Sequence, residues 1–240
     1  MRERNGRVGV FSTGLVRLPG LKLLLGAGQL RFRPSERAAR QLDAVAGWGH
    51  KPTAEAARAY AKRHGLPYLA LEDGFLRSVG LGGSEPPLSL IVDERGIYYD
   101  ARTPSALEEL LQSDTRLDDA LLLERAAKLR QRVVETGVSK YNHAPDELPP
   151  ELAGATDFVV VADQTYDDAS VSGALADDRT FERALQAALD EHPGARVIVK
   201  VHPATVAGKR RGYLAGRRFS ERVTMVSADV NPQALLRRAR

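Results

Sequence analysis

Short apolar segments typical of β-strands alternate along this chain with segments of helical periodicity. Three of the apolar segments, Arg7–Ser12, Leu42–Ala46 and Pro67–Leu71, lie in the first third of the chain, and a glycine follows each within three residues. The stretches 18–25 and 52–64, which lie between them, have the spacing of amphipathic helices. Strands joined through helices run parallel, because each crossover returns the chain to the same end of the sheet. We therefore predict an α/β fold built on parallel sheets.

The part of the chain after the third strand predicts an addition to this sheet. Leu88–Val92 and Ile97–Tyr99 flank the turn Asp93–Gly96, which indicates a β-hairpin. One helix is expected after Pro104, and a second from about Leu117 to Thr136, where Gly137 ends it.

A second strand–helix series follows a segment rich in proline and acidic residues. Phe158–Ala162, Arg196–Val201 and Val223–Ser227 are predicted strands, with a helix at Thr180–Glu191. The chain ends in a helix after Asn231-Pro232, whose Leu235 and Leu236 we expect to be exposed because the series offers only three strands. We predict a first Rossmann-like domain at 1–142, a linker at 143–156, and a second, incomplete Rossmann-like domain at 157–240.

Composition excludes several classes of protein. The 240 residues contain no cysteine, which excludes disulfides and thiolate metal sites, and no apolar run approaches the ~20 residues of a membrane span. The N-terminus lacks the apolar core of a signal peptide, so we expect a cytoplasmic protein. Lys209–Arg211 with Arg217 and Arg218 form a basic cluster, which fits either an anionic partner or a solvated face. No stacking aromatics or helix-turn-helix accompany this cluster, so we expect no nucleic-acid partner.

Polar residues at the ends of the later strands are candidates for phosphate chemistry. Asp163 follows one apolar strand, and Lys200 and His202 end the next, where residues two apart face the same way. Adjacent parallel strands bring such ends into one crevice, which gives an anion site beside a carboxylate nucleophile. The alternatives are that Asp163 caps a turn and that His202 is a capping or core residue. No Asp-x-Asp spacing occurs, so we expect no metal.

The first half offers a second set of candidates at strand ends. Glu72, Asp73 and Arg77 would suit a general base and acceptor binding, or form an internal salt bridge with a turn at Gly74. The segment Ser12-Thr13-Gly14 is not the Gly-x-Gly-x-x-Gly of dinucleotide-binding proteins, which argues against NAD.

Several of these segments together resemble the capsule β-Kdo transferases of the KpsC family. The resemblance spans most of the chain, with the motifs agreeing in order and spacing. They are Phe11–Gly14 with Arg17, Ala46–Thr53, Leu71–Ser78, the Leu88–Asp100 hairpin, Ser139–Asn142, Asp163–Ser170, and Val199–Pro203 with Gly208-Lys209.

The resemblance implies a two-domain, GT-B-like glycosyltransferase that transfers Kdo from CMP-Kdo without a cofactor. The acceptor would be a Kdo-bearing lipid of the phosphatidylglycerol type, bound by the first domain, while the second binds CMP. Capsule assembly and export proteins and the anionic inner-membrane surface are the further partners that it implies, for a cytoplasmic protein peripheral to that membrane.

The resemblance also implies roles for residues of this sequence. A β-linkage made from a β-linked donor means retention, which favours a carboxylate nucleophile, and Asp163 is the candidate. Glu72 or Asp73 would deprotonate the acceptor. Donor binding would involve Gln164, Asp168, Lys200, His202 and Pro203, and acceptor binding Ser12, Thr13 and Arg77.

The sequence departs from the family in two respects. Family members usually have glycine at the position of Asp167, so we expect this loop to gain a charge and to lose a positive-φ conformation. Members also continue well beyond Arg240, so we expect this chain to be a fragment that is poorly stable and inactive alone. Two alternatives are another CMP-sugar transferase, similar to sialyltransferases, and a non-catalytic remnant that binds the acceptor.

Overall fold

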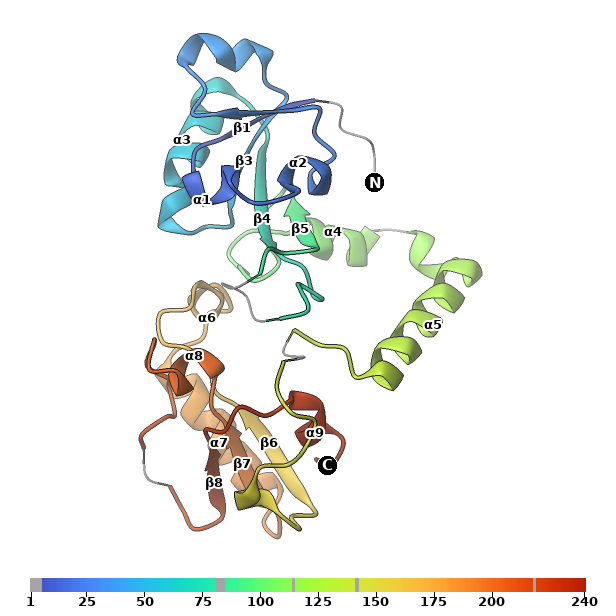
Figure 1. Cartoon of the computed structure of the whole chain (residues 1–240), viewed down its shortest axis with the longest axis vertical. Helices are drawn as coiled ribbons and strands as arrows, with labels where there is room; N and C mark the ends of the chain where they lie inside the picture. The colour runs from blue at the N-terminus through green and yellow to red at the C-terminus, as the bar shows by residue number, and fades with distance from the viewer. Residues whose placement is uncertain (1–5, 81–84, 114, 141–142, 218) are drawn as a thin grey trace. The chain divides into compact units, whose positions relative to one another are not determined.

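The computed structural model describes residues 6–80, 85–113, 115–140, 143–217 and 219–240 (Figure 1). The chain divides into two compact units, Met1–Lys140 and Tyr141–Arg240. The boundary predicted after residue 142 lies two residues from this division. Tyr141, Asn142 and Arg218, which the sequence analysis singled out, lie outside the described residues.

The first unit is built on a five-stranded sheet in the order β2-β1-β3-β4-β5. Neighbouring strands among the first four pair in parallel, and β5 pairs with β4 in the antiparallel direction. The predicted α/β fold with a parallel sheet is confirmed, although the edge strand β2 was missed because its residues are mostly exposed. The strands are β1 (Arg7–Val10), β2 (Gln29–Phe32), β3 (Ala44–Trp48), β4 (Tyr68–Asp73) and β5 (Leu90–Asp93).

Helical segments cover both faces of this sheet. Ala44 and Ala46 face a core that includes Leu15 and Leu21, whereas Val45 faces the opposite core. The helix expected over 18–25 is shorter than predicted, because Gly20 has φ 73° and interrupts the helical backbone. The segments are α1 (Thr13–Val16), α2 (Leu21–Leu24), the 3-10 helices η1 (Glu36–Gln41) and η2 (Pro52–Ala54), and α3 (Glu55–His64).

The hairpin predicted at 88–99 is wrong in its second half. β5 exists, but it pairs with β4, and 97–99 is not a strand. The Asp93 carboxylate accepts hydrogen bonds from the backbone N–H groups of Arg95, Gly96 and Ala106. These bonds close the turn and lead the chain into α4 (Ala106–Ser113) without a second hairpin strand.

The two helices predicted after residue 104 are present. The first is α4, and the second comprises η3 (Thr115–Asp118) and α5 (Ala120–Thr136). Asp119 caps the start of α5, and Gly137, with φ 64°, caps its end. No helix in the described ranges is both long and apolar enough to cross a membrane.

The second unit contains a three-stranded parallel sheet in the order β6-β7-β8, with the three predicted strands. Val197 and Val199 pack against Leu185, and Ile198 packs on the opposite face with Leu152 and Leu235. The strands are β6 (Phe158–Ala162), β7 (Arg196–Lys200) and β8 (Val223–Val226). The helices are η4 (Pro150–Leu152), α6 (Ala169–Gly173), α7 (Asp178–Glu191), α8 (Pro203–Val206) and α9 (Pro232–Leu236).

Two expectations for this unit differ from the structure. The segment 143–156, expected to be a linker, packs on the second unit: Leu152 is fully buried, and Pro145 O accepts a hydrogen bond from Asn231 N. Leu235, expected to be exposed, is buried in the same core, whereas Leu236 is 57% exposed. The physical reason is that α9 folds back over the sheet and covers its apolar face.

Candidate functional site

A pocket of about 330 Å³ lies at the carboxyl ends of β6 and β7 in the second unit. Five of the candidate site residues from the sequence line it, and α9 with the segment before it completes the wall. The lining residues are Val160, Ala162, Asp163, Gln164, Lys200, Val201, His202, Pro203, Asp229, Val230, Pro232, Leu235 and Leu236.

The Asp163 carboxylate is buried and tightly held by backbone donors. Its Oδ1 accepts hydrogen bonds from the N–H groups of Gln164, Tyr213 and Leu214, at 2.9, 3.1 and 3.1 Å. Its Oδ2 accepts one from Ala215 N, at 3.1 Å. This carboxylate both lines the pocket and organises the loop 212–215, so the turn-stabilising alternative and a pocket role coexist.

Gly212 allows the loop to approach this carboxylate. A Cβ atom at this position would lie 2.3 Å from Asp163 Oδ2, so any side chain would displace one of the two segments. The sequence analysis did not identify 212–215 as part of the site, because no local pattern links it to Asp163.

Lys200 supplies a partly buried cation to the same pocket. Its Nζ donates to the backbone oxygens of Val201 and Ala228, both at 3.1 Å. Burial lowers the pKa of the Lys200 ammonium. Among the described residues, these bonds engage two of the three donors of the ammonium, and the third is left for a ligand.

His202 caps α8 and lines the pocket at the same time. Its Nδ1 accepts a hydrogen bond from Ala204 N at 3.1 Å, so Nδ1 carries no proton. The ring proton of the neutral imidazole is therefore on Nε2, which makes Nε2 a donor. His202 and Lys200 therefore bring N–H donors to the same pocket, and such donors form charge-assisted hydrogen bonds with phosphate.

The remaining predicted donor residues lie in different places. Gln164 and Pro203 line the pocket, but Asp168 caps α6, with Oδ1 accepting from Ser170 N at 2.9 Å, and is not among the lining residues. Asp167 has φ 58°, so the expectation that this loop loses a positive-φ conformation is wrong. Aspartate tolerates the left-handed region better than most residues do.

The basic cluster at 209–217 is partly engaged within the protein. Arg211 stacks on the Tyr166 ring at 5.1 Å, and Arg217 pairs with Glu182. Lys209 and Arg210 are exposed. Asp229, in contrast, is a pocket residue that the sequence analysis missed, since it lies in a loop without a recognisable motif.

In the first unit, the predicted residues also lie at the carboxyl ends of strands. Ser12 caps α1 by accepting from Leu15 N at 3.4 Å, and Thr13 is exposed. Asp73 Oδ1 lies 2.8 Å from Arg77 Nε as an ion pair, with the N–H not directed for a hydrogen bond. The structure therefore contains the internal salt bridge that the sequence left open as an alternative. Glu72 Oε1 accepts from Asp73 N at 3.1 Å.

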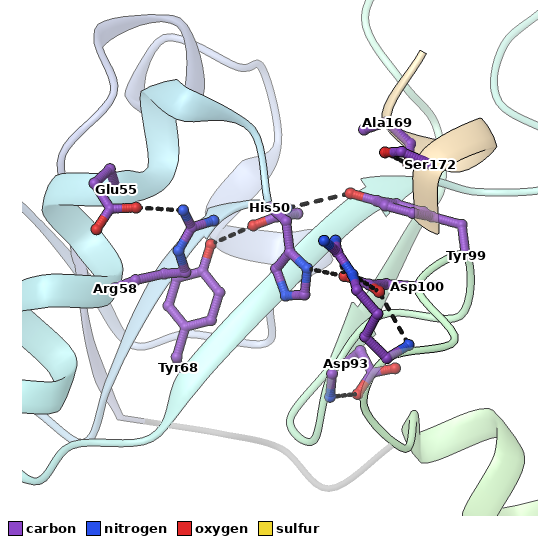
Figure 2. A network of polar contacts seen from close by, with 12 residues as sticks. His50, Glu55, Arg58, Tyr68, Asp93, Tyr99, Asp100, Ala169 and Ser172 are labelled. Atoms are coloured by element: carbon purple, nitrogen blue, oxygen red, sulfur yellow. Dashed lines mark hydrogen bonds and ion pairs between the residues drawn. The ribbon is translucent and has the colours of Figure 1, made fainter. Parts of the chain in front are cut away.

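A polar network that sequence reasoning missed lies at the same edge of this sheet (Figure 2). His50 follows β3, and its Nδ1 lies 2.7 Å from Asp100 Oδ2. The hydroxyl of Tyr99 accepts from His50 N at 3.2 Å, and the Tyr68 hydroxyl donates to Gly49 O at 2.8 Å. His50 and Asp100 each lie within a motif of the family resemblance. The 50 residues between them gave no sign in the sequence that they are in contact.

Asp100 is the centre of this network. Besides His50, it accepts hydrogen bonds from the Arg102 backbone N, Nε and Nη2, at 3.1, 2.7 and 2.7 Å. The hydrogen bonds from the Arg102 side chain, and then that from His50, hold the pKa of this carboxyl well below its usual range, despite its burial.

Comparison with known proteins gives consistent matches to capsule proteins. The model of the family described as capsule polysaccharide biosynthesis protein matches residues 43–156 and 123–240. The capsule polysaccharide modification protein LipA of Neisseria meningitidis serogroup A is 41% identical over 230 residues, which are 94% of this chain. The alignment covers 32% of LipA, so the chain spans about a third of the length of the curated relatives it matches.

Two solved structures from Thermosulfurimonas dismutans are similar to this chain. One, described as KpsC, beta Kdo 2,4 transferase, is 43% identical with a TM-score of 0.85, over 96% of this chain and 71% of that one. The other, described as KpsC, beta Kdo 2,7 transferase, is 26% identical with a TM-score of 0.51, over 96% and 75% of the two chains.

Proposed function

Because this chain belongs to the family of capsule polysaccharide biosynthesis proteins, we propose that it is a β-Kdo transferase module that uses CMP-Kdo. Its product would be a β-Kdo linker on a lipid acceptor for capsular polysaccharide. Two α/β units, each with polar residues at the carboxyl ends of parallel strands, are consistent with a GT-B-like transferase.

The donor would bind in the pocket of the second unit. Its volume lies near the lower end of the ~300–1,000 Å³ range of ligand pockets. Lys200 Nζ and His202 Nε2 would bind the phosphate of CMP-Kdo and stabilise the negative charge that develops as CMP leaves. Apolar wall residues, among them Val230 and Leu236, would exclude water from this site.

Asp163 would act as the nucleophile of a double displacement. A carboxylate oxygen attacks the anomeric carbon of Kdo, and the bond from that carbon to the phosphate oxygen breaks, with CMP taking the electron pair. An acceptor hydroxyl then attacks the same carbon, and the electrons of the ester bond return to Asp163. Oδ2 is the better placed oxygen, because it accepts one described hydrogen bond and Oδ1 accepts three.

We propose a 2,4 linkage for the product. The similarity to the KpsC structure described as a 2,4 transferase is much greater in both sequence and fold than that to the 2,7 transferase. The similarity to the 2,4 transferase over nearly the whole chain is also the single observation that carries the proposed function.

An assay with purified chain tests this function against the expectation from the sequence that the chain alone is inactive. The chain would be incubated with CMP-Kdo and a synthetic lipid glycoside that ends in β-Kdo, and products would be followed by mass spectrometry and CMP release. The expected product is the acceptor extended by Kdo, and NMR of that product would identify the linkage. Absence of both CMP release and extended acceptor would contradict the function, whereas a 2,7 product would contradict only the linkage.

A further inference from the structure

The network around His50 has the chemistry of a proton acceptor. His50 lies two residues beyond β3, at the same sheet edge as Ser12 and Glu72, which follow or end other parallel strands. Its side chain is 28% exposed, whereas that of Asp100 is 3% exposed. One ring nitrogen is therefore held by a buried carboxylate, while part of the ring remains accessible.

The hydrogen bond to Asp100 determines the tautomer of His50. An ionised carboxylate only accepts hydrogen bonds, so His50 Nδ1 must carry the proton that it shares with Asp100 Oδ2 at 2.7 Å. In the neutral ring, Nε2 then has an available lone pair. Arg102 forms hydrogen bonds with both oxygens of Asp100 and keeps the carboxylate in this orientation.

The carboxylates proposed from the sequence are less suited to this task. Asp73 lies between two cations, with Arg77 Nε at 2.8 Å and Lys140 Nζ at 3.6 Å. Glu72 directs Oε1 to the backbone of Asp73 at 3.1 Å. Both carboxylates therefore already have partners within the first unit.

We propose that His50 is the base that deprotonates the attacking hydroxyl of the acceptor, and that Asp100 positions it. This inference rests on the proposed function. As the hydroxyl oxygen attacks, its proton passes to His50 Nε2, and the ring becomes an imidazolium. The imidazolium then releases that proton to solvent, so the enzyme returns to its starting state.

The two half-reactions separate this role from the rest of the mechanism. Release of CMP in the first half-reaction needs no acceptor base, whereas transfer in the second does. His50→Gln and His50→Ala should therefore lower the rate of transfer to the acceptor by at least ~100-fold, which is the lower limit for general base catalysis. The release of CMP in the first turnover should stay within about threefold of wild type. Added imidazole should restore part of the transfer by His50→Ala.

The pH profile tests the positioning role of Asp100. Asp100→Asn should lower kcat for transfer with little change in the KM of the acceptor, and should change the acid side of the pH–rate profile. The titratable or charged groups around His50 are Asp100, Arg102, Tyr99, Tyr68, Glu72 and Lys51. Glu72→Gln serves to show whether a neighbouring carboxylate, instead of His50, produces this profile.

His64→Gln is the matched control, since His64 also pairs with a carboxylate, Glu36 at 2.6 Å, but ends α3 away from the carboxyl edge. It should transfer Kdo at the wild-type rate. The proposal for His50 is overturned if His50→Gln transfers within about threefold of wild type, or if it loses CMP release to the same degree. A wild-type chain that neither releases CMP nor transfers Kdo overturns the proposed function itself, and this inference with it.

Discussion

Two buried carboxylates near the sheet edges of the two units, Asp163 and Asp100, are held in opposite ways. Every described hydrogen bond to Asp163 comes from a backbone N–H group, and three come from the loop 213–215. Asp100 instead accepts three of its four from the side chains of His50 and Arg102. Side chains can rotate away and be rehydrated, whereas backbone donors in a folded loop cannot. The pocket of the second unit is thus coupled to the folding of that unit, and the network in the first unit is adjustable and sensitive to pH.

The largest expected effect follows from removal of the backbone-held carboxylate. Asp163→Ala leaves four backbone N–H groups without their acceptor, which should lower the free energy of unfolding of the second unit by about 3 kcal/mol or more. Trp48 is the only tryptophan and lies in the first unit, so its fluorescence follows that unit alone. In urea, the far-UV circular dichroism transition should shift, and the tryptophan transition should not.

Asp163→Asn is the control for this experiment. The amide retains one oxygen acceptor, so the loss of stability should be clearly smaller than for alanine. Equal stability of Asp163→Ala and wild type would contradict the coupling between the pocket and the fold of the second unit.

A smaller effect is expected for the side-chain network. Asp100→Ala should lower the free energy of unfolding of the first unit by about 1–2 kcal/mol, because the exposed Arg102 side chain regains water. The shift should be seen in Trp48 fluorescence. A loss as large as that of Asp163→Ala would remove the distinction between the two carboxylates.

The stability contributed by Asp100 should depend on pH. The pKa of this carboxyl is lowered in the folded state, so it stabilises the fold above the unfolded value of about 4. That contribution decreases as pH falls from about 4 toward the folded pKa. The difference in unfolding free energy between wild type and Asp100→Asn should therefore shrink below about pH 4, and a constant difference would contradict this ionisation.

In the pocket, loss of one cation should have a moderate effect on ligand binding. Lys200→Met should weaken CMP binding about tenfold, which corresponds to about 1.4 kcal/mol. Burial lowers the pKa of Lys200, so this lysine loses its charge at a lower pH than an ordinary lysine does. As pH rises, the affinity of the wild type for CMP should therefore begin to decline at that lower pH. Isothermal titration calorimetry with CMP measures both, and Lys209→Met, which alters an exposed lysine, should bind CMP as wild type does.

The smallest effect is expected at Asp168. Its carboxylate caps α6, so Asp168→Ala should cost about 1 kcal/mol of stability, as loss of a helix cap usually does. CMP affinity should be unchanged, because the side chain does not line the pocket. A tenfold weaker affinity would return Asp168 to the donor site, as the sequence resemblance implied.

The accuracy of the sequence analysis varied with the range of the interactions involved. β6 was predicted to the residue, since an uninterrupted apolar run between polar residues is typical of a buried strand. The ends of α3 and α5 were predicted by Gly65 and Gly137, both at positive φ. The 97–99 strand was wrong, because Asp93 draws the chain into α4 through contacts that extend 13 residues along the sequence.

The order of residues along the chain determined the α/β class, and parallel pairing of β6 and β7 follows from that order. Parallel pairing in turn brings Asp163, Lys200 and His202 to one pocket, because the carboxyl ends of neighbouring strands meet at one edge. Only the tertiary structure decided which side chains neutralise or orient one another. The pairing of Asp73 with Arg77 and of His50 with Asp100 depends on loop conformation and rotamers, and neither leaves a periodic signal in the sequence.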